Sequence, residues 1–139
     1  MDDIGVTPLK RISTPGGDVM HALKASDHGL KTFGEVYFSW IESKAIKAWK
    51  CHKRMTLNLV VPLGEVRFVF HLAEQKDDFR VEKIGEERYV RLTVPPGIWF
   101  GFQGNAYVRS LLMNVADLEH DQDEVLKKAV SKINYDWRF

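Results

Sequence analysis

The sequence has little cysteine and no excess of charge of either sign. Cys51 is its one cysteine, which excludes an intrachain disulfide and fits a reducing compartment. Lysine and arginine total 20, and aspartate and glutamate total 19, for a formal net charge of +1. This balance produces no overall field that would attract nucleic acid or an anionic membrane, so any anion site must be local.

Long apolar runs, internal repeats and linkers are also missing. No stretch is long enough to span a bilayer, and the start, Met1-Asp2-Asp3, lacks the basic and apolar regions of a signal peptide. Glycine and proline stand singly or in pairs between apolar runs rather than in a linker. We therefore expect a single domain over residues 1–139, located in the cytoplasm, with neither a membrane nor a nucleic acid as partner.

What the sequence does contain is a series of short segments rich in β-branched and aromatic residues. The predicted strands cover residues 34–40, 45–49, 56–61, 65–72, 79–84, 89–94, 98–102 and 107–115. Turn-forming residues separate many of them, and a turn-rich loop at residues 13–18 should lead into an earlier short strand. Because helical crossovers are absent, the pattern predicts an all-β antiparallel sandwich or barrel.

Only the C-terminal region predicts a helix, over residues 121–133. Asp121 and Asp123 are available to cap it. Its apolar residues recur at helical spacing, namely Val125, Leu126, Ala129, Val130 and Ile133. The last five residues, 135–139, are aromatic enough to predict a docked terminus.

Three stretches carry a family resemblance. They are residues 46–53 (IKAWKCHK), 60–69 (VVPLGEVRFV) and 94–102 (VPPGIWFGF). In the third, two prolines fix φ and Gly97 can adopt positive φ, so that the following strand turns inward. In order and spacing they resemble the RmlC-like cupins, the family of dTDP-4-dehydrorhamnose 3,5-epimerase and its relatives. The likeness covers about residues 34–117 and implies a cupin, a double-stranded β-helix or jelly-roll barrel, here with one C-terminal helix.

That family acts on nucleotide-linked 4-keto-6-deoxysugars, and the resemblance implies a histidine base, a nearby lysine and a tyrosine acid. Inversion beside a ketone needs a base, a donor to the enolate oxygen and an acid on the opposite face. Lys50 occupies the position of the catalytic histidine, and His52 follows two residues later. Because strand side chains alternate, we expect both in one enclosed pocket bordered by the turn at residues 95–97. We assign His52 as the base and Lys50 as the group that stabilises the enolate or holds phosphate.

Two other family positions differ in this sequence. Phe100 stands where the Pro-Pro-Gly segment of the family carries a histidine, and residues 114–119 contain no tyrosine where the family has its acid. Tyr37 and Tyr107 are candidate substitutes, although no spacing places either at the substrate. These departures keep open a cupin without catalytic activity that binds a nucleotide sugar or a protein partner.

A second relative is the group of sugar-nucleotide 3,4-ketoisomerases, which are also cupins. Their strand carries a His-x-His-Lys pattern, and Lys50-Cys51-His52-Lys53 retains the second histidine and the lysine. The prediction is therefore a nucleotide-sugar epimerase of the 3,5-epimerase type, and the alternatives are a 3,4-ketoisomerase or the inert binder. As in the family, we expect a homodimer, with the apolar segment at residues 36–38 available to a neighbouring copy.

Further residues are candidates for holding the substrate. Lys47, Arg54 and Arg67 can donate charge-assisted hydrogen bonds to a diphosphate, although each also fits a solvated charge at a strand edge. Asn58 and Trp99 are further candidate substrate contacts, and Trp49, Trp99 and Phe102 can stack on a base or sugar if they are not core residues.

Neither a metal nor another cofactor is expected. Metal-binding cupins need a cluster of histidines and a carboxylate, and only His52 lies in the appropriate strand. Cys51 alternates with Lys50 and His52, so it should be a buried apolar residue on the opposite face rather than a nucleophile.

Overall fold

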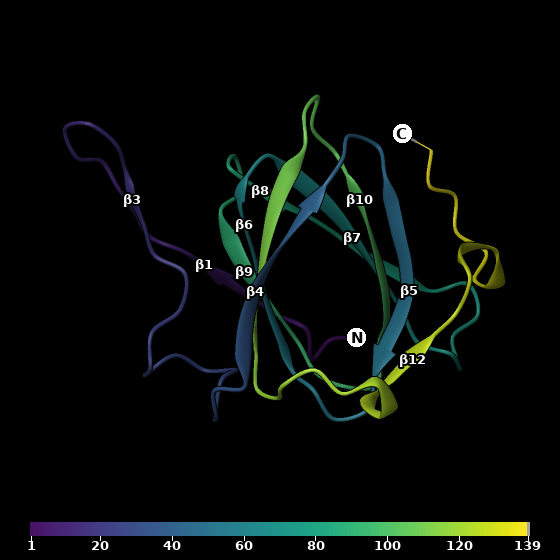
Figure 1. The fold of residues 1–139 in the computed structure, drawn as a ribbon. Coiled ribbons are helices and arrows are strands. Elements are labelled where there is room, and N and C mark those ends of the chain that lie inside the picture. The colour runs from purple at the N-terminus through teal and green to yellow at the C-terminus, as the bar shows by residue number, and fades with distance from the viewer. Residues whose placement is uncertain (139) are drawn as a thin grey trace.

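A computed structural model describes residues 1–138 and consists of two five-stranded antiparallel sheets that face each other (Figure 1). The first sheet contains, in spatial order, β1 (Gly5–Pro8), β9 (Val90–Val94), β6 (Leu57–Leu63), β11 (Ser110–Ala116) and β4 (Glu35–Ile41). The second contains β12 (Val125–Lys127), β5 (Ile46–His52), β10 (Trp99–Gly104), β7 (Glu65–His71) and β8 (Phe79–Gly85). All the predicted strands are present, so the all-β prediction is confirmed. No helix within residues 1–138 is long and apolar enough to cross a membrane.

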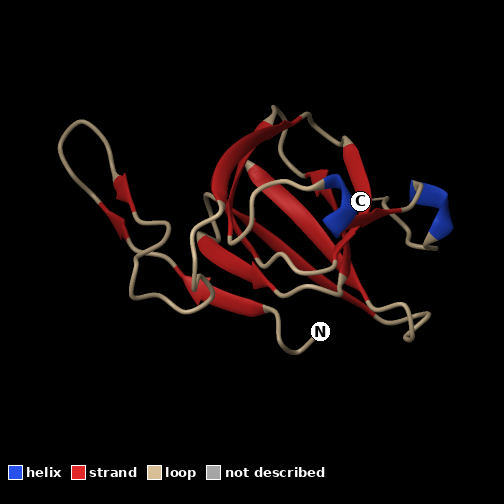
Figure 2. Ribbon diagram, turned by 60° about the horizontal axis from the view of Figure 1, so that its bottom comes forward, coloured by secondary structure: helices blue, strands red, loops and turns tan. Residues whose placement is uncertain are grey.

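A short hairpin extends from this sandwich. Its strands, β2 (Arg11–Ile12) and β3 (Val19–Met20), pair with each other and project away from the two sheets in Figures 1 and 2. The predicted loop at residues 13–18 forms its tip, where Gly16 and Gly17 both have positive φ. The expected loop and the short strand after it are thus confirmed.

Alternation along β7 explains how one strand contributes to two cores. Val66, Phe68 and Phe70 point into the space between the sheets and are fully buried. The intervening Val69 points the other way, into a cluster that the C-terminal tail covers. A second, outer core therefore lies on the far face of the second sheet.

The predicted C-terminal helix is wrong. Residues 121–133 form two 3-10 turns, η1 (Gln122–Glu124) and η2 (Val130–Lys132), on either side of β12 (Figure 2). Asp121 does cap η1, since its side chain accepts a hydrogen bond from the amide of Asp123. After η1 the chain continues as the extended strand β12, because the free edge of β5 offers hydrogen-bond partners to its backbone amides and carbonyls.

The docked tail is confirmed for the described residues. Trp137 is buried, and its ring contacts Trp49 at 5.2 Å and Tyr135 at 4.9 Å between centroids. Gly101 permits this approach, because a Cβ at that position would lie 2.5 Å from the Cβ of Ala48 and 3.1 Å from the Trp137 ring. Phe139, the last residue of the predicted segment, lies outside the described residues.

Candidate functional site

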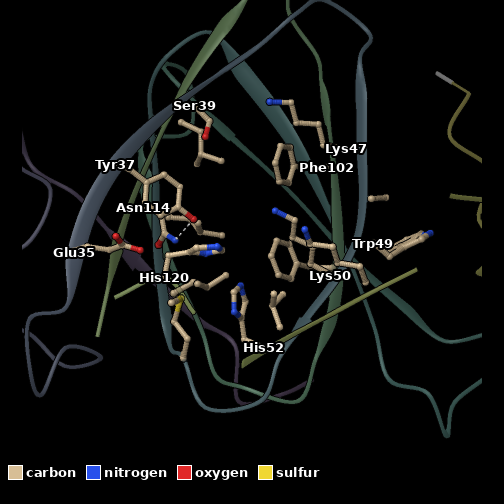
Figure 3. A pocket seen from close by; sticks show the side chains of 18 of the residues that line it. Glu35, Tyr37, Ser39, Lys47, Trp49, Lys50, His52, Phe102, Asn114 and His120 are labelled. Carbon is tan, nitrogen blue, oxygen red and sulfur yellow. Dashed lines mark hydrogen bonds between the residues drawn. The ribbon is translucent and has the colours of Figure 1, made fainter. Parts of the chain in front are cut away.

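The strand β5 carries three of the predicted site residues on one face. Lys47, Lys50 and His52 all line a cavity of about 700 Å³ between the two sheets (Figure 3). The shared face of Lys50 and His52 is the predicted one. Lys47 lies on the same face although it is three residues from Lys50. The pairing with β10 shifts at Phe100/Gly101, so Trp49 is an extra residue in β5 that displaces the alternation of side chains by one position.

His52 is held by a buried carboxylate. Its Nδ1 lies 2.5 Å from Oε1 of Glu124, and its ring stacks on Phe100 at 6.0 Å between centroids. The His52 side chain is 11% exposed and that of Glu124 only 1% exposed. The imidazole therefore has one nitrogen engaged by Glu124 and a ring plane fixed by Phe100.

Glu124 is ionised in this position. Burial raises the pKa of Glu124, but hydrogen bonds from His52 and from the backbone amides of Arg54 and Met55 outweigh it, so the pKa lies below its usual value. An ionised carboxylate only accepts hydrogen bonds, so Nδ1 of neutral His52 carries the proton and Nε2 carries the lone pair. His52 is thereby set up to act as a base through Nε2.

The cavity wall around Lys50 is strongly basic. Lys127 is the direct cross-strand partner of Lys50 on β12, and Lys47 lies on the same strand. Burial, followed by the charges of Lys127 and Lys47, lowers the pKa of Lys50. This wall suits an anionic ligand and weakens the hold of Lys50 on its proton.

The opposite wall supplies a phenol. Tyr37 on β4 lines the cavity, and its Oη accepts a hydrogen bond of 3.0 Å from Nδ2 of Asn114 on β11 (Figure 3). Asn114 is buried and its own Oδ1 accepts from the amide of Asn58, which fixes its orientation. Since Tyr37 accepts from Asn114, its O–H remains available to donate to a ligand.

No family model matches the sequence, and no curated protein matches it either. Solved structures do. A dTDP sugar isomerase from Desulfovibrio desulfuricans G20 is 29% identical with a TM-score of 0.91, and the match covers 98% of this chain and 91% of that one. The dTDP-4-dehydrorhamnose 3,5-epimerase of Bacillus anthracis str. Ames, with TDP and PPi bound, has 17% identity and a TM-score of 0.80 over 97% and 85% of the two chains. QdtA, a sugar 3,4-ketoisomerase from Thermoanaerobacterium thermosaccharolyticum in complex with TDP, has 16% identity and a TM-score of 0.76 over 94% and 92%.

The chain is a structural match to the RmlC-like cupin sugar isomerases and epimerases. The fold resemblance predicted from three short stretches is thus confirmed. In this cupin the turn at residues 95–97 has Gly97 at φ 89°, and the Gly97 amide donates to the carbonyl of His52 at 2.8 Å. The turn therefore supports the end of β5 that carries His52 without itself lining the cavity.

Four predicted substrate contacts do not line the cavity. Arg54 is exposed and lies 3.7 Å from Asp121. Arg67 is buried on the outer face, where it donates to Gln103 and to the carbonyl of Trp137. These partners hold Arg67 under the tail, on the face of β7 opposite to that of Val66, Phe68 and Phe70, and its role in phosphate binding stays an untested prediction.

Asn58 and Trp99 are likewise on outer faces. Asn58 donates to the carbonyl of Gly29 and accepts from Thr93, so it fastens the N-terminal loop rather than facing the cavity. Trp99 belongs to the outer cluster, with Nζ of Lys128 4.3 Å from its ring centroid. Trp49 is buried in that cluster and also borders the cavity, and Phe102 lines the cavity as well.

Cys51 lies where alternation predicted it, buried on the outer face, and burial raises the pKa of its thiol. Tyr107, the other candidate acid, is fully exposed on the β10–β11 loop. Within residues 1–138, no three His, Cys, Asp or Glu side chains gather in an arrangement that could hold a metal ion.

Sequence reasoning missed Glu124, Asn114 and His120. Glu124 lies 72 residues from His52 and was placed in the first turn of the predicted helix. His120 follows β11 in a loop and lines the cavity near Tyr37 (Figure 3). The one available signal was the presence of three acidic residues within 121–124, which by itself indicates a helix start as readily as a partner for histidine.

Proposed function

We propose that this cupin is a nucleotide-sugar epimerase acting on a 4-keto-6-deoxyhexose nucleotide by proton abstraction beside the ketone. The observation that carries the proposal is the pairing of two groups across one cavity. His52, with Glu124 behind it, stands on the second sheet, and Tyr37 stands on the first. A base and an acid on opposite walls suit inversion at a carbon between them, because the proton leaves one face and returns to the other.

The proposed substrate class fits the charge of the cavity. One wall is lined by Lys47, Lys50 and Lys127, which can donate hydrogen bonds to diphosphate oxygens. These lysines can supply the diphosphate contacts that were predicted for Arg54 and Arg67. The relative with 29% identity is a dTDP sugar isomerase, and the structures of the epimerase and of QdtA contain TDP. These ligands support a thymidine diphosphate sugar as the first substrate to test.

Solvent exchange tests the reaction. dTDP-4-keto-6-deoxyglucose is incubated in deuterated water with the protein, and incorporation is followed by proton NMR. We expect exchange at C3 and C5, with His52→Gln lowering the rate by about 10³-fold. The control is His28→Gln, which changes an exposed histidine outside the cavity. Exchange confined to C3 with migration of the carbonyl would instead show a 3,4-ketoisomerase, and binding without exchange an inert cupin.

The proposed acid has its own signature in the same experiment. Tyr37→Phe removes the O–H but leaves His52 and Glu124 in place, so the base can still take and return deuterium on its own face. We expect exchange to persist in Tyr37→Phe while formation of the epimerised product falls by about 10²-fold. Loss of both together would argue against separate acid and base roles.

We also propose that the protein is a homodimer. The outward side chains of β4 are apolar and exposed, with Val36 at 47%, Phe38 at 60% and Trp40 at 42%. Phe33, which is 66% exposed, lines a shallow hollow together with Val36 and so extends the same surface. A second copy is the occupant we propose, because one face paired with its own symmetry mate covers both patches at once.

A further inference from the structure

Lys50 is placed between two other ammonium groups on the cavity wall. Lys127 is its cross-strand partner and Lys47 lies three residues earlier on β5, brought to the same face by the extra residue at Trp49. Among residues 1–138, no ion pair joins Lys50 to a carboxylate. Burial and the two neighbouring charges lower the pKa of Lys50, so a larger fraction of it is a neutral amine than of an ordinary lysine. A neutral amine in a cavity is a nucleophile toward carbonyl carbon.

The second part of the geometry is the position of Lys50 relative to the base. Lys50 and His52 are two residues apart on one face of one strand, which separates their Cα atoms by about 7 Å. The long lysine side chain and the imidazole both extend into the same space in Figure 3. A substrate bound with its ketone carbon within reach of Lys50 can therefore place a neighbouring C–H group within reach of His52.

We propose that Lys50 forms an imine with the ketone carbon of the substrate, an inference that rests on the proposed function and adds covalent catalysis to it. Nζ attacks the carbonyl carbon and a proton passes from the nitrogen to the former carbonyl oxygen. The resulting hydroxyl takes one further proton from solvent and leaves as water, which gives the protonated imine. His52 then removes a proton from the adjacent carbon, and the electron pair of that C–H bond moves into the enamine.

Return of a proton completes the cycle. Tyr37, on the opposite wall, donates a proton to the enamine carbon, and the imine is formed again with inverted configuration. Water adds to this protonated imine, the carbon–nitrogen bond breaks, and the ketone, the neutral amine of Lys50 and one proton are released. His52 gives its proton to solvent and Tyr37 regains one from solvent, so each group returns to its starting state. Water leaves in the first half and returns in the second, so no oxidant, reductant or cofactor is required.

The charges around Lys50 are consistent with one lysine that reacts and neighbouring lysines that bind the diphosphate. On the lysine side the other titratable residues that line the cavity are Lys47, His52, Lys127 and Lys128, and across the cavity they are Glu35, Tyr37 and His120. Lys47 and Lys127 can stay protonated and hold the diphosphate while Lys50 reacts. The alternative role for Lys50, a charged donor to an enolate, requires the ammonium form, and this difference makes the two roles separable.

Trapping tests the imine directly. The protein is mixed with dTDP-4-keto-6-deoxyglucose and sodium cyanoborohydride, which reduces an imine to a stable secondary amine. We expect the intact mass to rise by that of the substrate less one oxygen atom, with peptide mapping placing at least about tenfold more adduct on Lys50 than on any other lysine. Lys50→Arg keeps a positive charge but cannot form the imine, and it should lose the adduct and about 10²-fold of the exchange rate.

A variant of the neighbouring Lys127 gives a second readout, the pH dependence of adduct formation, which would not exist if Lys50 were only a charged donor. Lys127→Met removes one of the charges that lower the pKa of Lys50, so the pH at which adduct forms half-maximally should shift upward. Wild-type exchange without adduct on Lys50, or exchange retained in Lys50→Arg, overturns the imine while leaving the proposed function standing. If adduct forms on Lys50 but no exchange is seen, Lys50 is a nucleophile toward the ketone and the proposed epimerase activity is contradicted.

Competitive acetylation supplies a test that needs no substrate. Trace acetic anhydride labels only neutral amines, and the yield at Lys50 against pH is compared with that at Lys76, an exposed lysine in the β7–β8 loop. We expect Lys50 to titrate at lower pH than Lys76. Coincident titration curves would overturn the proposal, whatever the outcome with the sugar nucleotide.

Discussion

At the scale of single residues, Glu124 connects the chemistry to the fold. One of its oxygens receives Nδ1–H of His52, and the other receives the backbone amides of Arg54 and Met55, which turn the chain out of β5. The carboxylate thus orients His52, the proposed base, and also holds the β5–β6 connection. Removing its charge should affect both stability and catalysis.

Glu124→Gln is expected to lower the free energy of unfolding by about 2 kcal/mol at pH 7, because hydrogen bonds to a buried charge are replaced by weaker ones. The pKa of Glu124 in the folded protein lies below the ordinary value of 4.5. Its contribution is therefore fully present above about pH 4.5 and is lost as pH falls through the lower folded pKa. Urea unfolding of wild type and variant at pH 7 and at pH 3.5 measures the difference, which should shrink at the lower pH.

The control is Glu119→Gln, which changes an exposed carboxylate in the preceding loop. It should leave the free energy of unfolding within about 0.5 kcal/mol of wild type at both pH values. A Glu124→Gln deficit of the same size at pH 7 and pH 3.5 would mean that the ionised carboxylate is not what stabilises this connection.

At the scale of secondary-structure elements, the strands could be predicted and the C-terminal region could not. Strand alternation is local, so the common face of Lys50 and His52 follows from their spacing alone. The spacing of the apolar residues from Val125 to Ile133 fits a helix as well as it fits an edge strand flanked by 3-10 turns. What decides is a partner far away in sequence, the free edge of β5, where Lys128 and Trp49 exchange backbone hydrogen bonds of 3.0 and 3.1 Å.

The same non-locality hid the outer core. Arg67, Trp99 and Asn58 are polar or amphipathic residues on strands. The aromatic tail predicts a docked terminus, but the sequence does not say which sheet face a tail or loop covers. Only the observed packing shows that Arg67 donates to the carbonyl of Trp137 rather than to a ligand. Roles that depend on which segment covers a sheet face were therefore out of reach of the periodicity.

Trp137→Ala tests whether the tail holds β12 and, through it, Glu124. Trp137 packs on Trp49 and Tyr135 in the outer core, so its truncation should lower the free energy of unfolding by about 3 kcal/mol. Amide hydrogen exchange should accelerate most at Trp49 and Lys128, whose mutual hydrogen bonds join β5 to the tail. Tyr107→Ala, at a fully exposed position, is the control. Unchanged protection at Lys128 would show that β12 stays paired without the tail.

At the scale of the whole molecule, two properties act together. The net charge of +1 provides almost no mutual repulsion between copies, and the outer face of β4 presents Val36, Phe38 and Trp40 to solvent. The inner face of the same strand carries Tyr37, the proposed acid. A contact that covers the outer face would therefore also restrain the strand from which the acid enters the cavity.

The homodimer proposal predicts that wild-type protein sediments at twice the monomer mass of 16.0 kDa at micromolar concentration. Phe38→Lys places a charge at the centre of the apolar row, and burying an unpaired ammonium there should weaken association at least about 100-fold. Tyr107→Lys introduces the same charge on an exposed loop and should remain dimeric. Sedimentation equilibrium with all three proteins measures the constants, and a monomeric wild type would show that the β4 face is not covered by a second copy. If Phe38→Lys is monomeric yet folded, its exchange rate with the sugar nucleotide reports how far the restraint on β4 contributes to the placement of Tyr37.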